Sequence, residues 1–216
     1  MAELMVVRHA QASFGADNYD KLSDLGHRQS ALLGQYLRCA GWIPDRLVTG
    51  TLVRQQETLA SMGFADAPET HHGFNEYDFH NLLSVRFNGD VPNAVMGERK
   101  THFRTLRETI LEWQRGGLDG ADESWVTFET RVAEALKFAT DTDARRVLVI
   151  SSGGAIGQLV ASVLGAPSPQ MMELNLQMRN TSTTRFVFSA RGIGLTEFNS
   201  LPHVTSDLAS EMITYS

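Results

Sequence analysis

The sequence predicts an α/β fold, with a mostly parallel sheet, helices on both faces and a helical cap insertion. Short apolar runs alternate with segments of helical periodicity up to residue 63 and again from about residue 145. Such alternation is typical of parallel strands joined by helices. The block between them, about residues 76–144, has longer helical patterns and no clear strand. We therefore expect a single domain over residues 1–216 that carries this block as a cap insertion.

The first strand ends in two residues that can carry chemistry. Residues 4–7 are apolar and include two valines, as expected of a buried strand in a parallel sheet, and Arg8 and His9 follow directly. In open α/β sheets, ligands bind beyond the carboxyl ends of the strands. A neutral imidazole there is a candidate nucleophile, and the adjacent guanidinium is a candidate anion-binding group.

A helix and a second strand–helix unit come next. Ser23 is a plausible N-cap for a helix that stops near Gly41, and residues 46–50 form the next apolar strand. Residues 51–59 continue as a helix, so that Arg54 lies near its first turn. Because a helix N-terminus favours an anion, Arg54 is expected at the same rim as His9.

The last strand–helix unit begins with a strand over residues 145–150. The turn Ser151-Ser152-Gly153-Gly154 leads from it into a helix with an apolar stripe. After Pro169, residues 183–188 and 195–198 are predicted to form closing strands.

The middle block is predicted to contain a long loop and two helices. Residues 84–99 include two glycines and Pro92 among polar groups, which indicates a loop. Helical spacing of apolar residues then appears over 103–113 and 128–139. We expect this block to cover the carboxyl edge of the sheet and to face the substrate. The alternative, a helical layer without substrate contact, stays open.

Composition excludes several classes of function. Apolar residues make up 42% and charged residues 20% of the chain, as in ordinary globular proteins. A formal net charge of −6 argues against broad nucleic-acid binding, which needs a basic surface. No run approaches the ~20 apolar residues of a membrane span. The single cysteine, Cys39, cannot form an internal disulfide, and no signal peptide is visible, so we expect a cytoplasmic protein. Nothing indicates an oligomer.

Several motifs, in order, resemble the histidine phosphatase superfamily, the phosphoglycerate-mutase-like group. The first is the Arg8-His9 pair, the second is Leu-Ser-x-x-Gly-x-x-Gln at residues 22–29, and the third is Arg-x-x-x-Thr at residues 54–58. The resemblance continues in residues 74–78, 123–124, 131–132, 179–182, 197–199 and 202–203.

The resemblance implies roles for these residues. His9 would attack phosphorus and form a phosphohistidine, while Arg8 and Arg54 hold the phosphoryl oxygens. Glu76 would protonate the leaving group and later activate water, with Asp78 as the alternative acid. The remaining candidates would line the phosphate pocket: Gln11, Ser13, Asn18 and Gly153. We expect no metal and no cofactor. The expected partner is a small phosphorylated substrate or inorganic phosphate.

Ser152 is the main departure from the family. The family carries a second active-site histidine at this position, where a serine offers only a neutral hydroxyl. The N–H groups of the turn and the helix dipole remain available. We expect a site that is weakened but not empty, and we expect Ser152→His to raise the rate. A smaller departure is Ala10, where the family most often has glycine.

Together these features predict a metal-independent phosphomonoesterase that acts on a small phosphorylated metabolite through a phosphohistidine. Two alternatives remain open. One is a phospho-ligand-binding protein with weak or lost catalysis, which Ser152 favours. The other is a phosphomutase. The sequence does not name the substrate.

Overall fold

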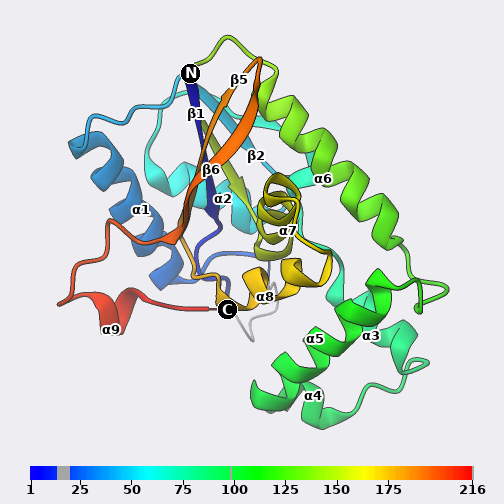
Figure 1. Ribbon diagram of the computed structural model, residues 1–216. Coiled ribbons are helices and arrows are strands. Elements are labelled where there is room, and N and C mark those ends of the chain that lie inside the picture. The colour runs from blue at the N-terminus through cyan, green and yellow to red at the C-terminus, as the bar shows by residue number, and fades with distance from the viewer. Residues whose placement is uncertain (14–19, 98, 216) are drawn as a thin grey trace.

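A computed structural model describes residues 1–13, 20–97 and 99–215 of the chain. Its centre is a six-stranded sheet with the order β3-β2-β4-β1-β5-β6 (Figure 1). Strands β1 to β4 pair in parallel, whereas β5 is antiparallel to β1 and β6 is antiparallel to β5. The strands are β1 Ala2–Arg8, β2 Arg46–Thr49, β3 Glu69–Thr70, β4 Arg146–Ser151, β5 Thr183–Ser189 and β6 Gly192–Ser200. The predicted mostly parallel sheet is confirmed.

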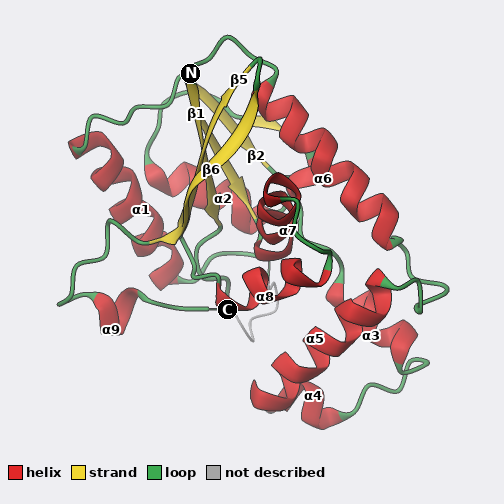
Figure 2. Cartoon of the chain, in the orientation of Figure 1, coloured by secondary structure: helices red, strands yellow, loops and turns green. Residues whose placement is uncertain are grey.

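Helices cover both faces of the sheet, as the sequence predicts (Figure 2). The first half of the chain contributes α1 Asp24–Cys39, α2 Val53–Met62, the short 3₁₀-helix η1 His72–Phe74, α3 Phe79–Arg86 and α4 Asn93–Gly97. The second half contributes α5 Arg99–Gln114, α6 Trp125–Thr140, α7 Gly153–Leu164, α8 Pro169–Gln177 and α9 Ala209–Met212. No helix in the part of the chain that the structure describes is long and apolar enough to cross a membrane.

Alternate residues of the central strands pack into two separate cores. One face presents Met5, Val7, Leu148 and Ile150 to apolar residues of α1 and α2, which are Leu33, Leu37, Leu59 and Met62. The other face presents Leu4, Val6, Val147 and Val149 to apolar residues of α6 and α7, among them Phe128, Ile156 and Leu159. Burial on both faces explains why these strands are continuous apolar runs in the sequence.

The predicted loop over residues 84–99 is wrong at both ends, although residues 87–92 do lie outside helices and strands. Helix α3 extends to Arg86, and α4 occupies Asn93–Gly97. Asp78 begins α3 by accepting a hydrogen bond from the N–H of Asn81 at 3.0 Å. Only a few apolar residues anchor these short helices, with Leu82 and Leu83 buried in α3. Such a short pattern shows no helical periodicity, and this explains why the sequence suggested a loop.

The predicted cap insertion, about residues 76–144, is split between two parts of the structure. Helix α6 lies beside α7 and packs against η1, so it belongs to the helical layer on one face of the sheet (Figure 1). Helices α3, α4 and α5 lie at the lower right of the same view, next to α8. The guanidinium of Arg107 in α5 binds the carboxylate of Glu173 in α8 at 2.8 Å. An aromatic cluster of Tyr77, Trp113, Trp125 and Phe128 joins these parts.

Candidate active site

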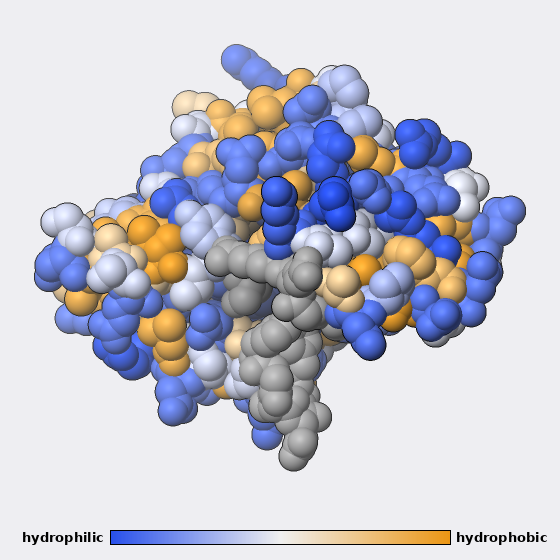
Figure 3. Space-filling view, turned by 90° about the horizontal axis from the view of Figure 1, so that it is seen from below, coloured by the Kyte–Doolittle hydropathy of each residue, from blue (hydrophilic) through white to orange (hydrophobic). Residues whose placement is uncertain are grey.

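Three parallel strands end at one level, and the candidate residues follow them. Arg8 at the end of β1 is paired with Ser151 of β4, and Thr49 at the end of β2 is paired with Ile150. The N–H of His9 donates to the carbonyl of Ser151 at 2.9 Å. His9, Ser152 and the start of α2 therefore meet at the carboxyl edge of the sheet, where the fold class places ligands. Figure 3 shows the molecule from this side, where hydrophilic and hydrophobic residues are interspersed.

The hydrogen bonds of His9 determine the tautomer of its imidazole. Nδ1 lies 2.8 Å from the carbonyl oxygen of Ala10, which can only accept, so Nδ1 carries a proton. The Nε–H of Arg54 points at Nε2 across 3.2 Å and can only donate, so Nε2 carries a lone pair. His9 is 5% exposed. The ring thus presents a neutral, nucleophilic nitrogen to the group that binds beside Arg54.

The surroundings of His9 also favour the neutral ring. Burial lowers the pKa of His9 well below its ordinary value, and the nearby charges of Arg54 and Arg8 lower it further. Burial and like charge both disfavour the imidazolium form. His9 is therefore neutral at pH 7, which a nucleophile requires.

Two arginines converge on His9 and are held by other groups. The Nη1 of Arg54 lies 2.6 Å from Oδ1 of Asp20, and the other carboxylate oxygen of Asp20 accepts from the N–H of Val53 at 2.8 Å. Asp20 thereby holds both the guanidinium and the first turn of α2. The Nη1 of Arg8 donates to the carbonyl of Met178 at 2.5 Å. Each guanidinium is fixed on one side by protein acceptors.

Glu76 lies at the N-terminus of α7. Its Oε1 and Oε2 each lie 3.1 Å from the N–H of Gly154. A side chain at residue 154 would overlap the Glu76 carboxylate, and one at Gly153 would overlap the amide of Asn175. The two glycines thus let these polar groups approach the first turn of the helix. Asp78 is occupied as the N-cap of α3, and this favours Glu76 over Asp78 as the acid.

Ser152 follows β4 as expected, but its side chain is engaged. Its Oγ accepts a hydrogen bond from Nε2 of Gln55 at 2.9 Å, and both residues are fully buried. Ser152 makes no side-chain cap for α7. The structure therefore brings Ser152 to the site edge with its hydroxyl bonded to a buried amide.

The predicted pocket-lining residues fall into three groups. Gln11 and Ser13 bond to the segment before α1: Oε1 of Gln11 accepts from Oγ of Ser23 at 2.8 Å, and Oγ of Ser13 donates to the carbonyl of Leu22 at 2.8 Å. Gly153 is the first residue of α7, where backbone N–H groups lack partners within the helix. Asn18 lies outside the described residues.

Three buried polar side chains hold the loop after β1. Thr58 accepts from the N–H of Ala10 at 3.0 Å, and Gln29 accepts from the N–H of Gln11 at 2.9 Å. The amide of Asn180 donates to the carbonyl of His9 at 3.1 Å. All three residues belong to the sequence motifs that carry the family resemblance. Those motifs do not indicate what the three side chains do. Their contacts show that they fix the backbone around His9.

Four residues near the site were missed by sequence reasoning: Asp20, Gln55, Tyr77 and Asn175. The amide of Asn175 in α8 donates to the hydroxyl of Tyr77 at 3.0 Å. Burial raises the pKa of Tyr77 well above its ordinary value, and the Glu76 carboxylate adds to this, so the phenol stays protonated. Only Tyr77 had a usable signal in the sequence, its position next to Glu76.

A buried histidine supports the loop that carries Asn180. Thr181 has a positive φ of 55°, in the left-handed region that threonine rarely adopts. Its Oγ1 lies 3.1 Å from Nε2 of His203. Burial lowers the pKa of His203 to about 4, so this histidine is neutral at pH 7. His203 thus contacts the loop whose Asn180 side chain bonds to the carbonyl of His9.

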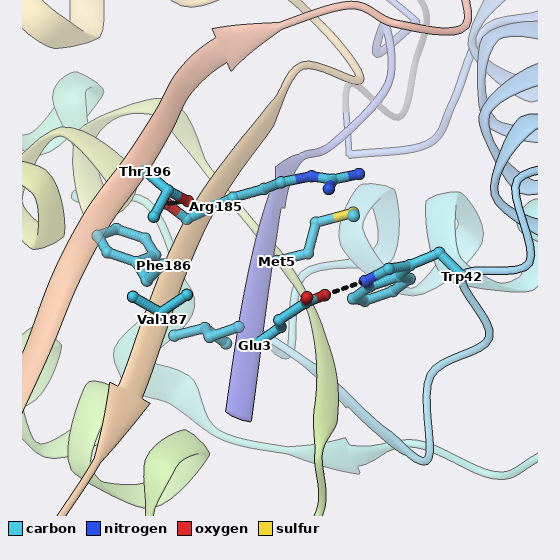
Figure 4. A pocket seen from close by; sticks show the side chains of 8 residues that line it. Glu3, Met5, Trp42, Arg185, Phe186, Val187 and Thr196 are labelled. Carbon is cyan, nitrogen blue, oxygen red and sulfur yellow. Dashed lines mark hydrogen bonds between the residues drawn. The ribbon is translucent and has the colours of Figure 1, made fainter. Parts of the chain in front are cut away.

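One pocket in the structure lies away from the site. It is lined by residues of β1, β5, β6 and the loop after α1, including Glu3, Trp42, Arg185 and Thr196 (Figure 4). The indole N–H of Trp42 donates to Glu3 at 2.6 Å. Glu3 is near the start of β1, whereas His9 follows its end. Among the described residues, no group of three or more histidines, cysteines or carboxylates is arranged to hold a metal ion.

A comparison with models of known protein families identifies the family of this chain. The model of the histidine phosphatase superfamily (branch 1) matches residues 4–201, which is most of the chain. The chain belongs to this superfamily. The resemblance in the sequence motifs is thereby confirmed. A curated relative of this histidine phosphatase superfamily member, named "Probable phosphoglycerate mutase GpmB" in Citrobacter koseri, is 26% identical over 200 residues, which cover 86% of this chain and 84% of the relative. A protein of the same name in Cronobacter sakazakii is 25% identical, with the same coverage.

Solved structures share the fold of this superfamily member. A mutant phosphoserine phosphatase from Entamoeba histolytica, in complex with phosphoserine, aligns with a TM-score of 0.68 and 18% identity, over 95% of this chain and 100% of that one. The α-ribazole phosphatase from Shigella flexneri aligns with a TM-score of 0.67 and 18% identity, over 92% and 96%. A mycobacterial glucosyl-3-phosphoglycerate phosphatase aligns with a TM-score of 0.67 and 19% identity, over 93% and 99%.

Proposed function

We propose that this superfamily member is a metal-independent phosphomonoesterase that hydrolyses a small phosphorylated metabolite through a phosphohistidine on His9. One observation carries the proposal. The buried, neutral ring of His9 presents Nε2 to the guanidinium of Arg54 at 3.2 Å. A nucleophile with its lone pair next to a cation is suited to attack a group that carries negative charge.

In the first step, the phosphoryl oxygens bind to Arg8, Arg54 and the N–H of Gly153. Guanidinium groups hold such oxygens bidentately, and phosphoryl transfer depends mostly on positioning and charge stabilisation. As the Nε–H of Arg54 turns from Nε2 of His9 to a phosphoryl oxygen, the freed lone pair of Nε2 forms a bond to phosphorus while the bond from phosphorus to the ester oxygen breaks. Glu76, which takes up a proton as the phosphate ester binds, gives that proton to the leaving alkoxide.

In the second step, water hydrolyses the phosphohistidine. The Glu76 carboxylate takes a proton from the water as its oxygen bonds to phosphorus and the bond to Nε2 breaks. Inorganic phosphate leaves, Glu76 releases its proton to solvent, and both His9 and Glu76 return to their starting states. This role for Glu76 is supported by its place against the first turn of α7, beside Gly153.

The similar solved structures support hydrolysis of a small molecule. Three of them are named as phosphatases, of phosphoserine, α-ribazole and glucosyl-3-phosphoglycerate. A formal net charge of −6 argues against nucleic acid as a partner. A cytoplasmic location is part of the proposal, since the one cysteine, Cys39, is free and exposed.

The test is a screen of phosphate release over small phosphorylated metabolites. Wild-type protein should release phosphate from at least one of them, and His9→Ala should abolish that release. His27→Ala is the matched control, because His27 contacts Ser61 on the outside of α1 and α2, and it should keep full activity. Equal activity in wild type and His9→Ala contradicts the proposal.

A phosphomutase is the second candidate, favoured by the names of the two curated relatives. The two activities differ in their product. A mutase moves the phosphoryl group between hydroxyls of the substrate, whereas a phosphatase releases it to water. Phosphorus NMR of a reaction with 3-phosphoglycerate separates them, since we expect inorganic phosphate and no isomer. The neutral Ser152 favours a third candidate, a phospho-ligand-binding protein. Such a protein would bind inorganic phosphate but release no phosphate from any ester in the screen.

A further inference from the structure

Gln55 joins three segments of the site. Its Nε2 donates to the carbonyl of Phe74 at 2.8 Å and to Oγ of Ser152 at 2.9 Å. Its Oε1 accepts from the N–H of Leu52 at 3.3 Å. Leu52 begins the helix that carries Arg54, Phe74 leads to Glu76, and Ser152 leads to Gly153.

The orientation of this amide is fixed by its partners. The carbonyl of Phe74 can only accept, and the N–H of Leu52 can only donate, so the nitrogen and oxygen of the amide cannot be exchanged. Both amide hydrogens and the oxygen are used, and Gln55 is fully buried. The side chain thus has no amide hydrogen left to donate to a phosphoryl oxygen, although it follows Arg54 directly.

Small or polar residues lie beside the Gln55 amide. A side chain at Gly50 would overlap Oε1 of Gln55, so the glycine lets the amide keep its present position. The hydroxyl of Ser151 also donates to the carbonyl of Phe74, at 2.8 Å. These contacts form a buried polar cluster, and a buried polar cluster is stable only when each member keeps its partners.

We propose that Gln55 is a positioning residue of the phosphate site and that, together with Ser152, it fills the space in which the family resemblance implies a second histidine. This inference rests on the proposed function. The pair is neutral and bonded internally. It holds the segments that carry Arg54, Glu76 and Gly153 in fixed positions relative to one another. The charges that bind the phosphoryl group come from Arg8 and Arg54.

This inference changes the expectation for Ser152→His. An imidazole at residue 152 must extend into space that the Gln55 amide occupies, 2.9 Å from the serine oxygen. The single substitution should therefore lower activity instead of raising it. Shortening Gln55 to alanine at the same time vacates that space, and an imidazole there can donate to the carbonyl of Phe74.

The experiment compares four proteins: wild type, Gln55→Ala, Ser152→His and the double variant. The probes are p-nitrophenyl phosphate for kcat and KM, and inorganic phosphate for affinity by calorimetry. Each single substitution should lower kcat about tenfold or more, and the double variant should recover to within about threefold of wild type, as expected of coupled neighbours. The new imidazole should also add a titrating limb to the pH dependence of phosphate binding in the double variant.

Independent effects contradict the inference. If the two losses multiply within about twofold, Gln55 and Ser152 do not act together. Gln56→Ala is the matched control, since Gln56 is an exposed neighbour on the same helix, and it should match wild type. If a bulky variant does not fold, Gln55→Met and Ser152→Ala complete the cycle, because they remove the hydrogen bond without added volume.

The two readouts separate this inference from the proposed function. A wild type that binds phosphate but hydrolyses no ester contradicts the proposed function. In that case the phosphate affinities of the four proteins still test whether Gln55 and Ser152 act together. Recovery of phosphate affinity in the double variant supports the inference, and independent losses of affinity contradict it.

Discussion

The Nε–H of Arg54 donates to Nε2 of His9 across 3.2 Å, while the opposite ring nitrogen bonds to the carbonyl of Ala10 at 2.8 Å. This arrangement fixes one neutral tautomer before any ligand binds. The lone pair of Nε2 faces the guanidinium that is proposed to hold the phosphoryl group. Nucleophile and anion-binding group are therefore positioned by one contact.

The first prediction concerns the protonation of His9. Burial, Arg54 and Arg8 lower its pKa, so the ring should stay neutral as the pH falls through 6.5 and should gain a proton only well below it. NMR of the histidine ring signals against pH measures this directly, without interference from the ionisation of a substrate. Arg54→Gln removes one of the two cations, so the pKa of His9 should rise in that variant. An unchanged pKa in Arg54→Gln contradicts the electrostatic role of Arg54.

The second prediction concerns stability at low pH. Folded His203 has a pKa of about 4, below its ordinary value of 6.5, so between these values the unfolded chain binds a proton that the folded chain does not. The free energy of unfolding should therefore fall as the pH decreases, by about 2 kcal/mol from His203 between pH 7 and 4.5.

Urea unfolding at several pH values tests this by comparing wild type with His203→Gln. Glutamine can keep the contact with Thr181 and does not titrate. The free energy of unfolding of the variant should depend less on pH in this window. Parallel curves for the two proteins would show that His203 does not contribute.

The third prediction concerns Asp20, which bonds both Arg54 and the first turn of α2. Asp20→Asn keeps an acceptor for the N–H of Val53 but loses the charge that orients the guanidinium. We expect kcat/KM to fall about tenfold, since small misplacements of a binding group cost about that much or more. Asp24→Asn, an exposed change in the first turn of α1, is the control and should have no effect.

Fold and site differ in how far the sequence predicts them. Strands β1, β2 and β4 and helices α1, α2 and α7 were predicted because their apolar patterns reflect burial. Helix α3 was missed because a cap and two buried leucines stabilise it, and α4 was missed because it is only one short turn. Arg86, in the segment for which the sequence predicts a loop, instead binds Glu108 and Glu112 of α5.

The site shows the same division. Arg8, His9, Arg54 and Glu76 stand at motif positions or strand ends, so local sequence identifies them. Gln55 bonds a residue 97 positions away, and such a contact leaves no local signal. A glutamine in a helix also resembles a surface residue until the fold shows what covers it.

The fourth prediction concerns metal ions. Arg8 and Arg54 supply the positive charge near His9 that a metal would supply elsewhere. Prolonged treatment with EDTA, followed by removal of the chelator, should leave the rate of phosphate release unchanged. A loss of activity that Mg²⁺ or Zn²⁺ restores would show that the arginines are not sufficient.

The central claim is that His9 carries the phosphoryl group between substrate and water. Rapid mixing with a phosphorus-labelled substrate, followed by an alkaline quench, preserves a phosphoramidate, which acid would break. Peptide mass spectrometry should then find up to one phosphate per chain on His9, formed and lost within a single turnover. Hydrolysis at the full rate with no phosphate on His9 at any time point would contradict the mechanism.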